Sequence, residues 1–247
     1  AIPNCRYVVF KDKYAYVSAY AGPVQISPNA RIGYVAKVDT ATLEVVSECI
    51  VGYQPEEMAV VGNKLYVANS GGYRAPNYDR TVSVIDLKTF TETKKIDVAI
   101  NLHRIQPDNY GNLYVSSRGD YYDVPSKTFI IDTRTDKVTN TLQLLANSHM
   151  TLCRDSLYVY SNEWNYNTKK WTVSYAIVDT RTQKIVTRNF IKDGTDKKIK
   201  VPYGLAVNPN TGDFFVTDAK DYVSPGTLYC FNSMGVCKWS VTTIAYE

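Results

Sequence analysis

A pattern that recurs five times constrains the fold of this 247-residue chain more than any other feature. Each copy has an apolar strand, a short polar turn, a Leu-Tyr-Val-like strand, a long variable loop, a strand ending in Asp, a Thr-rich turn and a last strand. The Leu-Tyr-Val-like strands are Ala15-Tyr16-Val17, Leu65-Tyr66-Val67, Leu113-Tyr114-Val115, Leu157-Tyr158-Val159 and Phe214-Phe215-Val216. Short alternating strands without a helical period predict an all-β fold, a β-propeller of four-stranded blades.

The spacing of the Asp residues gives the blade boundaries. Asp39, Asp86, Asp132 and Asp179 lie 47, 46 and 47 residues apart, and Asn232 follows 53 residues later. We therefore expect one propeller domain over residues 1–247, with five visible blades at approximately 5–51, 52–99, 100–145, 146–196 and 197–243. Residues 244–247 look like the start of a further first strand. A seven-bladed ring with about two blades outside this sequence is the favoured interpretation, and a closed five-bladed ring is the alternative.

The repeated Asp residues have a structural explanation. Each is followed by a Thr-rich turn, as in Asp132-Thr133-Arg134-Thr135, and Asp and Thr side chains accept backbone N–H bonds in tight turns. The fifth copy has Asn232, which can do the same. We therefore assign these residues to turns and not to catalysis.

Composition excludes several classes of protein. The chain is 45% hydrophobic and 21% charged, which is typical of a globular domain, and its net charge of +4 is spread along the sequence, so we expect no nucleic-acid partner. No apolar run could span a bilayer, and no signal peptide opens the sequence. The five cysteines have no zinc-site spacing. Cys230 and Cys237 flank a turn; free thiols are expected, with a cross-strand disulfide as the alternative.

The long variable loops indicate where a ligand would bind. If the four strands of a blade are called a to d from the axis outward, the long b–c loops (18–33, 68–81, 116–128, 160–173 and 217–227) and the starts of the a strands meet at one face. Tyrosine is abundant, with 21 residues, and offers a rigid apolar ring with a polar tip. The predicted ligand-binding residues are Tyr73, Arg74, Tyr78, His103, Arg104, Arg118, Tyr121, Tyr122, His149, Asn162, Trp164, Tyr166, Tyr203, Asp221 and Tyr222.

Enzymatic chemistry is not expected. A propeller glycosidase needs two carboxylates across the channel, whereas the visible a strands carry only Glu56 and Glu57, whose side chains should alternate between opposite faces. His103 and His149 lie one residue apart in register and lack a carboxylate partner, so no metal and no cofactor are predicted. A hydrolase or lyase whose catalytic groups lie in blades outside this sequence is the alternative.

The repeat resembles the YVTN, or YncE-like, propeller family. Pro202-Tyr203-Gly204-Leu205-Ala206-Val207, Tyr66-Val67-Ala68-Asn69 and Val82-Ser83-Val84-Ile85-Asp86 correspond to that family's motifs. Its relatives include surface lipoprotein propellers of gut bacteria that capture cobalamin and pass it to an outer-membrane transport barrel. The resemblance implies a monomeric, cell-surface or outer-membrane protein that binds a corrinoid; a glycan- or protein-binding scaffold is the alternative.

Overall fold

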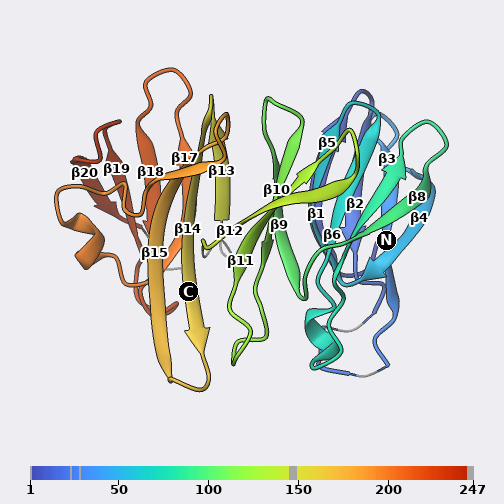
Figure 1. Cartoon of the computed structure of the whole chain (residues 1–247), viewed down its shortest axis with the longest axis horizontal. Helices are drawn as coiled ribbons and strands as arrows, with labels where there is room; N and C mark the ends of the chain where they lie inside the picture. Colours follow the sequence, from blue (N-terminus) through green and yellow to red (C-terminus); the bar gives the residue numbers. More distant parts are fainter. Residues whose placement is uncertain (1, 23, 28, 145–148, 244–247) are drawn as a thin grey trace. The chain divides into compact units, whose positions relative to one another are not determined.

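A computed structural model of the chain describes residues 2–22, 24–27, 29–144 and 149–243. These residues form five four-stranded antiparallel sheets, and in each sheet consecutive strands are neighbours (Figure 1). Each sheet corresponds to one predicted blade, so the prediction of four-stranded blades is confirmed. The last strand of the first sheet, Val45–Tyr53, runs two residues past the expected boundary at residue 51. The chain divides into two compact units, residues 1–107 with 111–143 and residues 108–110 with 144–247. A single domain over residues 1–247 stays a prediction.

The first unit holds three blades. In chain order their strands are β1 (Cys5–Lys11), β2 (Tyr14–Ala19), β3 (Ile32–Asp39), β4 (Val45–Tyr53), β5 (Pro55–Val61), β6 (Lys64–Asn69), β7 (Thr81–Asp86), β8 (Thr91–Asp97), β9 (Leu102–Pro107), β10 (Asn112–Ser117), β11 (Lys127–Asp132) and β12 (Lys137–Leu142). The short 3₁₀ helix η1 (Gly72–Arg74) lies in the second b–c loop.

The second unit holds two blades. Their strands are β13 (His149–Cys153), β14 (Ser156–Asn165), β15 (Lys170–Asp179), β16 (Lys184–Thr187), β17 (Pro202–Val207), β18 (Phe214–Asp218), β19 (Thr227–Phe231) and β20 (Cys237–Thr242), with the 3₁₀ helix η2 (Thr195–Lys198) between β16 and β17.

Strands a and b pair in the same register in all five blades. The aligned pairs are Val8 with Val17, Met58 with Val67, Ile105 with Val115, Met150 with Val159, and Leu205 with Val216. At the start of strand a the register shifts in four blades, for example between Pro55 and Met58. Such an irregularity re-aims the side chains at the end of the strand.

The turn role of the repeated Asp residues is confirmed. Oδ1 of Asp86 accepts hydrogen bonds from the backbone N–H groups of Lys88 and Thr89, at 2.7 and 3.1 Å. The bond from the residue two positions later recurs at Asp39, Asp132, Asp179 and Asn232. The fourth residue after each Asp has a positive φ, between 51° and 61°, which closes the turn: Leu43, Phe90, Asp136 and Gln183.

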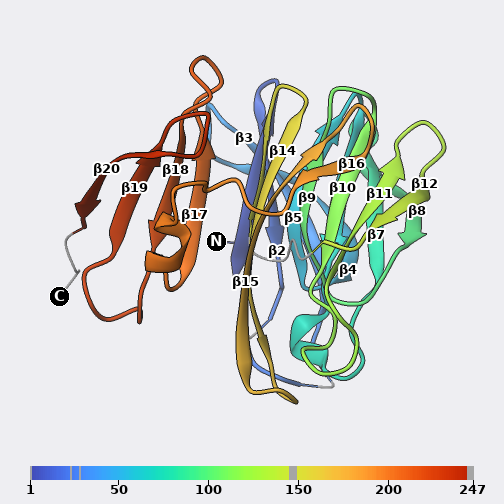
Figure 2. The same ribbon diagram turned by 60° about the vertical axis from the view of Figure 1, so that its left-hand side comes forward.

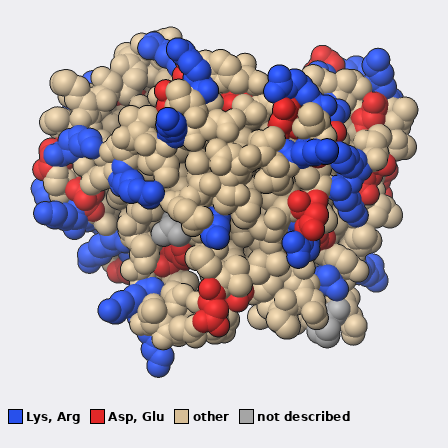
Figure 3. Space-filling model, viewed as in Figure 1, with Lys and Arg blue, Asp and Glu red and all other residues tan. Residues whose placement is uncertain are grey.

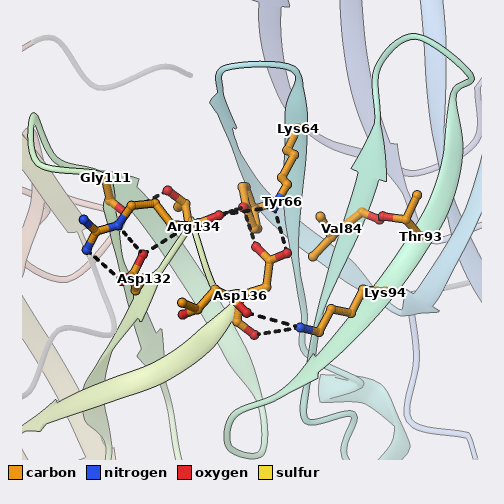
Figure 4. Close-up of polar contacts among 11 residues, drawn as sticks. Lys64, Tyr66, Val84, Thr93, Lys94, Gly111, Asp132, Arg134 and Asp136 are labelled. Atoms are coloured by element: carbon orange, nitrogen blue, oxygen red, sulfur yellow. Dashed lines mark hydrogen bonds and ion pairs between the residues drawn. The ribbon is translucent and has the colours of Figure 1, made fainter.

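Blades of the first unit pack face to face. Tyr16 and Val35 of the first blade join Leu65, Ile85 and Phe90 of the second in one buried cluster. A polar contact also joins the second and third blades, since the Tyr66 hydroxyl donates to Oδ1 of Asp136 at 2.7 Å and Nζ of Lys64 lies 2.8 Å from Oδ2 (Figure 4). The strand-b tyrosine of one blade therefore meets the c–d turn of the next.

Two sequence predictions receive direct answers in the second unit. Cys230 and Cys237 are free thiols, as expected. The strand register places Cys230 opposite Trp239 and Cys237 opposite Phe231, so the two cysteines do not form a cross-strand pair. The prediction of a loop over residues 160–173 is wrong. β14 extends to Asn165 and β15 begins at Lys170, so that only a four-residue turn separates the two strands (Figure 2). Alternating side chains and a cross-strand pair of tryptophans favour strand here over loop.

We predict that Tyr66→Phe lowers the free energy of unfolding by about 1–2 kcal/mol, because it removes a buried hydrogen bond to Asp136. The matched control is Tyr16→Phe, since Tyr16 occupies the equivalent position but packs on Phe90 at a ring distance of 5.7 Å. Urea denaturation measures both. Equal effects of the two substitutions would contradict the role of the hydroxyl.

The Asp turns also predict acid sensitivity. Hydrogen bonds from the Arg134 side chain and backbone hold the pKa of Asp132 at about 2. Because this lies below the value of about 3.9 for an unfolded chain, the stabilisation is complete above about pH 4 and is lost as the pH falls towards 2. In the Asp132→Asn variant, the free energy of unfolding should fall less steeply between about pH 4 and pH 2 than in the parent protein. Urea denaturation at several pH values measures this slope. An unchanged slope would contradict the prediction.

Candidate ligand-binding site

The first unit gathers charged and aromatic side chains at the starts of its three a strands. We call this group the Glu56 cluster. It comprises Arg6 and Tyr7 from β1, Tyr20 directly after β2, Glu56 and Glu57 from β5, His103 and Arg104 from β9, and Arg118 directly after β10. Residues from three blades therefore meet at the end of the blades that the sequence predicts for binding.

Glu56 is the buried centre of the cluster, with 1% of its surface exposed. The Tyr20 hydroxyl donates a short hydrogen bond to Oε1 of Glu56. Guanidinium nitrogens of Arg6 and Arg118 lie 3.4 and 3.7 Å from its carboxylate oxygens. A carboxylate that is removed from water in this way needs such partners, so Glu56 holds two arginines from different blades close to each other.

Glu57 forms a second carboxylate position beside the first. Its Oε1 lies 3.6 Å from Nη1 of Arg104, and its Oε2 accepts the backbone N–H of Ile105 at 2.9 Å. Burial raises the pKa of Glu57, although the positive charge of Arg104 opposes that shift. Glu57 and Arg104 thus join the second and third blades within the cluster.

Tyr7 connects the two carboxylate positions. Its hydroxyl lies 3.0 Å from Nε2 of His103, and the guanidinium of Arg104 lies 5.2 Å from the centre of its ring. Burial raises the pKa of Tyr7, and the negative charges of Glu56 and Glu57 act in the same direction. The two carboxylates nevertheless have different partners, since Glu56 contacts Tyr20 and two arginines whereas Glu57 contacts Arg104. The expectation that they face opposite sides of the strand stays a prediction.

A cavity of about 320 Å³ adjoins this cluster. Tyr7 and Glu57 line it together with residues of the three a strands: Val8, Val9, Phe10, Met58, Ala59, Val60, Ile105, Gln106 and Pro107. The side chains of Tyr7, Glu57 and Gln106 thus add polar groups to a space whose other lining residues are apolar. Such a combination is typical of small-ligand sites.

Of the predicted residues in this unit, His103, Arg104 and Arg118 belong to the Glu56 cluster. Tyr73 lies next to it, with its ring 6.1 Å from that of Tyr20. The guanidinium of Arg74 instead packs on Tyr53, with its central carbon 3.7 Å from the centre of the ring. This contact stabilises the b–c loop that contains Arg74.

Three further predicted tyrosines of this unit lie in b–c loops. Tyr122 is 51% exposed, whereas Tyr78 and Tyr121 are half-buried. Tyr121 also has a positive φ of 67°.

The second unit has a separate recess of about 530 Å³ at the same end of the fifth blade. Tyr203 and Tyr222 line it and meet edge to face, with ring centres 6.0 Å apart. Asp221 is not part of this lining, because its carboxylate accepts hydrogen bonds from Val223 and Ser224 within the loop. Asp221 therefore has a turn role in this loop, and its contact with a ligand stays a prediction.

His149 and the other predicted residues of the fourth blade lie in two different places. His149 stacks on Tyr160 at the base of β14, with ring centres 6.1 Å apart. Asn162, Trp164 and Tyr166 lie further out, where β14 and β15 extend beyond β13. The structure therefore separates these three residues from the start of strand a.

Sequence reasoning missed Tyr20 as a site residue, although a signal was present. Tyr20 follows Val17 by three residues, as Arg118 follows Val115, and these valines are aligned in register. The predicted ligand-binding residues also lack Arg6, Tyr7, Glu56 and Glu57, although these lie at the starts of a strands, where a site was expected. Their contacts depend on how the blades pack, which the alignment does not contain.

No ion-binding group of three or more His, Cys, Asp or Glu side chains occurs among the residues that the structure describes. Within the same residues, no helix is long and apolar enough to cross a membrane. Positive and negative side chains are interspersed on the face shown in Figure 3, without a continuous basic patch.

Comparison with known proteins bears on the fold. No protein-family model matches the sequence, and no curated protein matches it. One similar solved structure is hydrazine synthase of Kuenenia stuttgartiensis, with a TM-score of 0.69 and 17% sequence identity over 94% of this chain. Another is the Cps50 (Swd1) β-propeller domain of Myceliophteria thermophila, with a TM-score of 0.60 and 13% sequence identity over 94% of this chain. The computationally designed Ika8 protein has a TM-score of 0.59 and 12% identity over 98% of this chain and 76% of its own.

The fold is a β-propeller. The chain spans 64% of the hydrazine synthase chain and 66% of the Swd1 chain. At these identities the likeness concerns the fold alone. The resemblance to the YVTN family, and a ring of seven blades, stay predictions.

We predict that Glu56→Gln destabilises the protein by about 1–3 kcal/mol, because the neutral amide leaves Arg6 and Arg118 without their shared negative partner. Glu48→Gln is the matched control, since Glu48 is an exposed glutamate in the first blade. Thermal and urea unfolding measure the difference. Equal stability of the two variants would show that Glu56 does not hold the cluster together.

Proposed function

We propose that this chain is a non-enzymatic ligand-binding propeller, and that its ligand binds where the a strands start. The Glu56 cluster carries this proposal. Its arginines retain 36% side-chain exposure at Arg6, 22% at Arg118 and 17% at Arg104. Arg104 contacts Tyr7 and Glu57, and these two residues line the neighbouring cavity. Charged donors beside an apolar cavity suit a ligand that has both polar groups and a large apolar body.

A corrinoid is the ligand that we propose first. It combines a broad conjugated ring with amide side chains, so it can use aromatic and guanidinium partners together. The proposal rests on the resemblance to cobalamin-capturing propellers and on the exposed tyrosines of the b–c loops, such as Tyr122. By the same resemblance we propose a cell-surface or outer-membrane location, with an outer-membrane transport protein as partner.

Binding without catalysis is favoured by the contacts of the two carboxylates. Glu56 contacts Arg6, Arg118 and Tyr20, and Glu57 contacts Arg104 and the backbone N–H of Ile105, so both carboxylates are engaged in contacts that organise the cluster. A hydrolase or lyase that uses groups outside this sequence is the competing function. A glycan- or protein-binding scaffold at the cell surface is the other.

Titration of the protein with cyanocobalamin, followed by calorimetry and visible absorbance, tests the proposal. We expect saturable binding that Arg118→Gln and Tyr122→Ala each weaken by about tenfold, because one side chain contributes roughly 1–2 kcal/mol to such a contact. The matched control is Arg134→Gln, since Arg134 is an exposed arginine of the same blade in the c–d turn. Absence of binding would remove the corrinoid. Equal loss in the control would move the site away from the Glu56 cluster.

A further inference from the structure

The hairpin of β14 and β15 extends far beyond the rest of its blade. β13 pairs with β14 only as far as Tyr160, and β16 pairs with β15 only from Ile177 onward. Five residue pairs, from Ser161–Ser174 to Asn165–Lys170, therefore form a two-stranded ribbon, which we call the arm (Figure 2). At about 3.4 Å per residue, the arm is roughly 17 Å long.

The two faces of the arm differ in chemistry. One face presents Trp164 opposite Trp171 and Asn162 opposite Val173. The other face is polar throughout: Ser161, Glu163, Asn165, Lys170, Thr172 and Ser174. A ribbon that served only as a solvated connection would have no reason to concentrate two tryptophans on one side.

The aromatic side chains at the tip form a recess and remain exposed. Ring centres of Trp164 and Trp171 are 5.3 Å apart, and Tyr166 in the turn lies 6.2 Å from Trp164. Among the residues that the structure describes, these three line a recess of about 320 Å³. Trp171 is 57% exposed and Tyr166 53% exposed, although both carry large apolar rings. Exposed aromatic surface that surrounds a recess is typical of a binding site.

A neutral sugar fits this chemistry. The face with the two tryptophans carries an amide at Asn162 and no charged side chain, so it favours an uncharged ligand with hydrogen-bonding groups. Pyranose rings whose substituents are equatorial expose C–H bonds on both sides, and these bonds stack on the negative faces of aromatic rings. We infer that the tip of the arm, formed by Trp164, Tyr166 and Trp171, is a subsite for a neutral oligosaccharide, distinct from the proposed corrinoid site.

Tryptophan fluorescence provides a specific test, because the chain has only three tryptophans. In a Trp239→Phe background the signal comes from Trp164 and Trp171 alone. We expect cellotetraose to cause a saturable change in emission, and sorbitol, a linear polyol, to cause none. Tyr166→Ser should weaken binding by about fivefold or more, whereas Tyr166→Phe, which keeps the ring, should retain it.

Tyr222→Ser is the matched control, since Tyr222 lines the other aromatic recess of the same unit. It should leave the affinity for cellotetraose unchanged. No saturable change with cellotetraose, an equal response to sorbitol, or unchanged affinity in Tyr166→Ser would overturn the inference. A response to phosphatidylcholine vesicles alone would also overturn it, in favour of contact with lipid.

Cyanocobalamin titration of Tyr166→Ser separates this inference from the proposed function. We expect corrinoid affinity to be the same as in the parent protein. Cellotetraose binding without any corrinoid binding would support the sugar subsite and end the corrinoid proposal. The converse result would support the corrinoid site and end the sugar subsite.

Discussion

Face-to-face packing of neighbouring blades is the interaction on which the rest of this structure depends. A four-stranded sheet cannot bury both of its faces alone, so each blade is stable only against another. In the first unit, Tyr16 and Val35 of one blade and Leu65 and Ile85 of the next share a single apolar cluster. The same packing brings Tyr66 onto the turn that contains Asp136. The tight Asp turn is therefore also a contact between blades.

The Glu56 cluster is a product of this packing. Its members come from β1, β5 and β9 and from the ends of β2 and β10, which are far apart in the sequence. Glu56 is buried, yet it contacts residues from the blades on both sides. Arg6 belongs to the first blade and lies 50 residues earlier in the chain, and Arg118 belongs to the third blade. A site of this type requires the blades to be in place first, so its integrity and the stability of the unit are linked.

The arm of β14 and β15 shows a different relation between structure and binding. Its tip depends little on packing between blades, because the pairing of two strands and the contact of Trp164 with Trp171 organise it locally. An isolated two-stranded hairpin is only marginally stable in water, and a cross-strand aromatic pair is one of the few local devices that support it. Exposure of Trp171 and Tyr166 then leaves aromatic surface available to a ligand.

Local chemistry that the sequence carries determined the blades, their register and their turns. The alternating strands and the Asp-Thr turns depend on neighbours in the chain, and the structure has both as predicted. Only the tertiary structure decided which side chains meet. Packing between blades brings Arg6 and Arg118 to Glu56. Backbone N–H groups of its own loop donate to Asp221, and the pairing of β14 with β15 carries Trp164 away from the start of strand a. These outcomes depend on packing between blades and on the details of strand pairing. The alternation of apolar and polar residues in the sequence predicts neither of these.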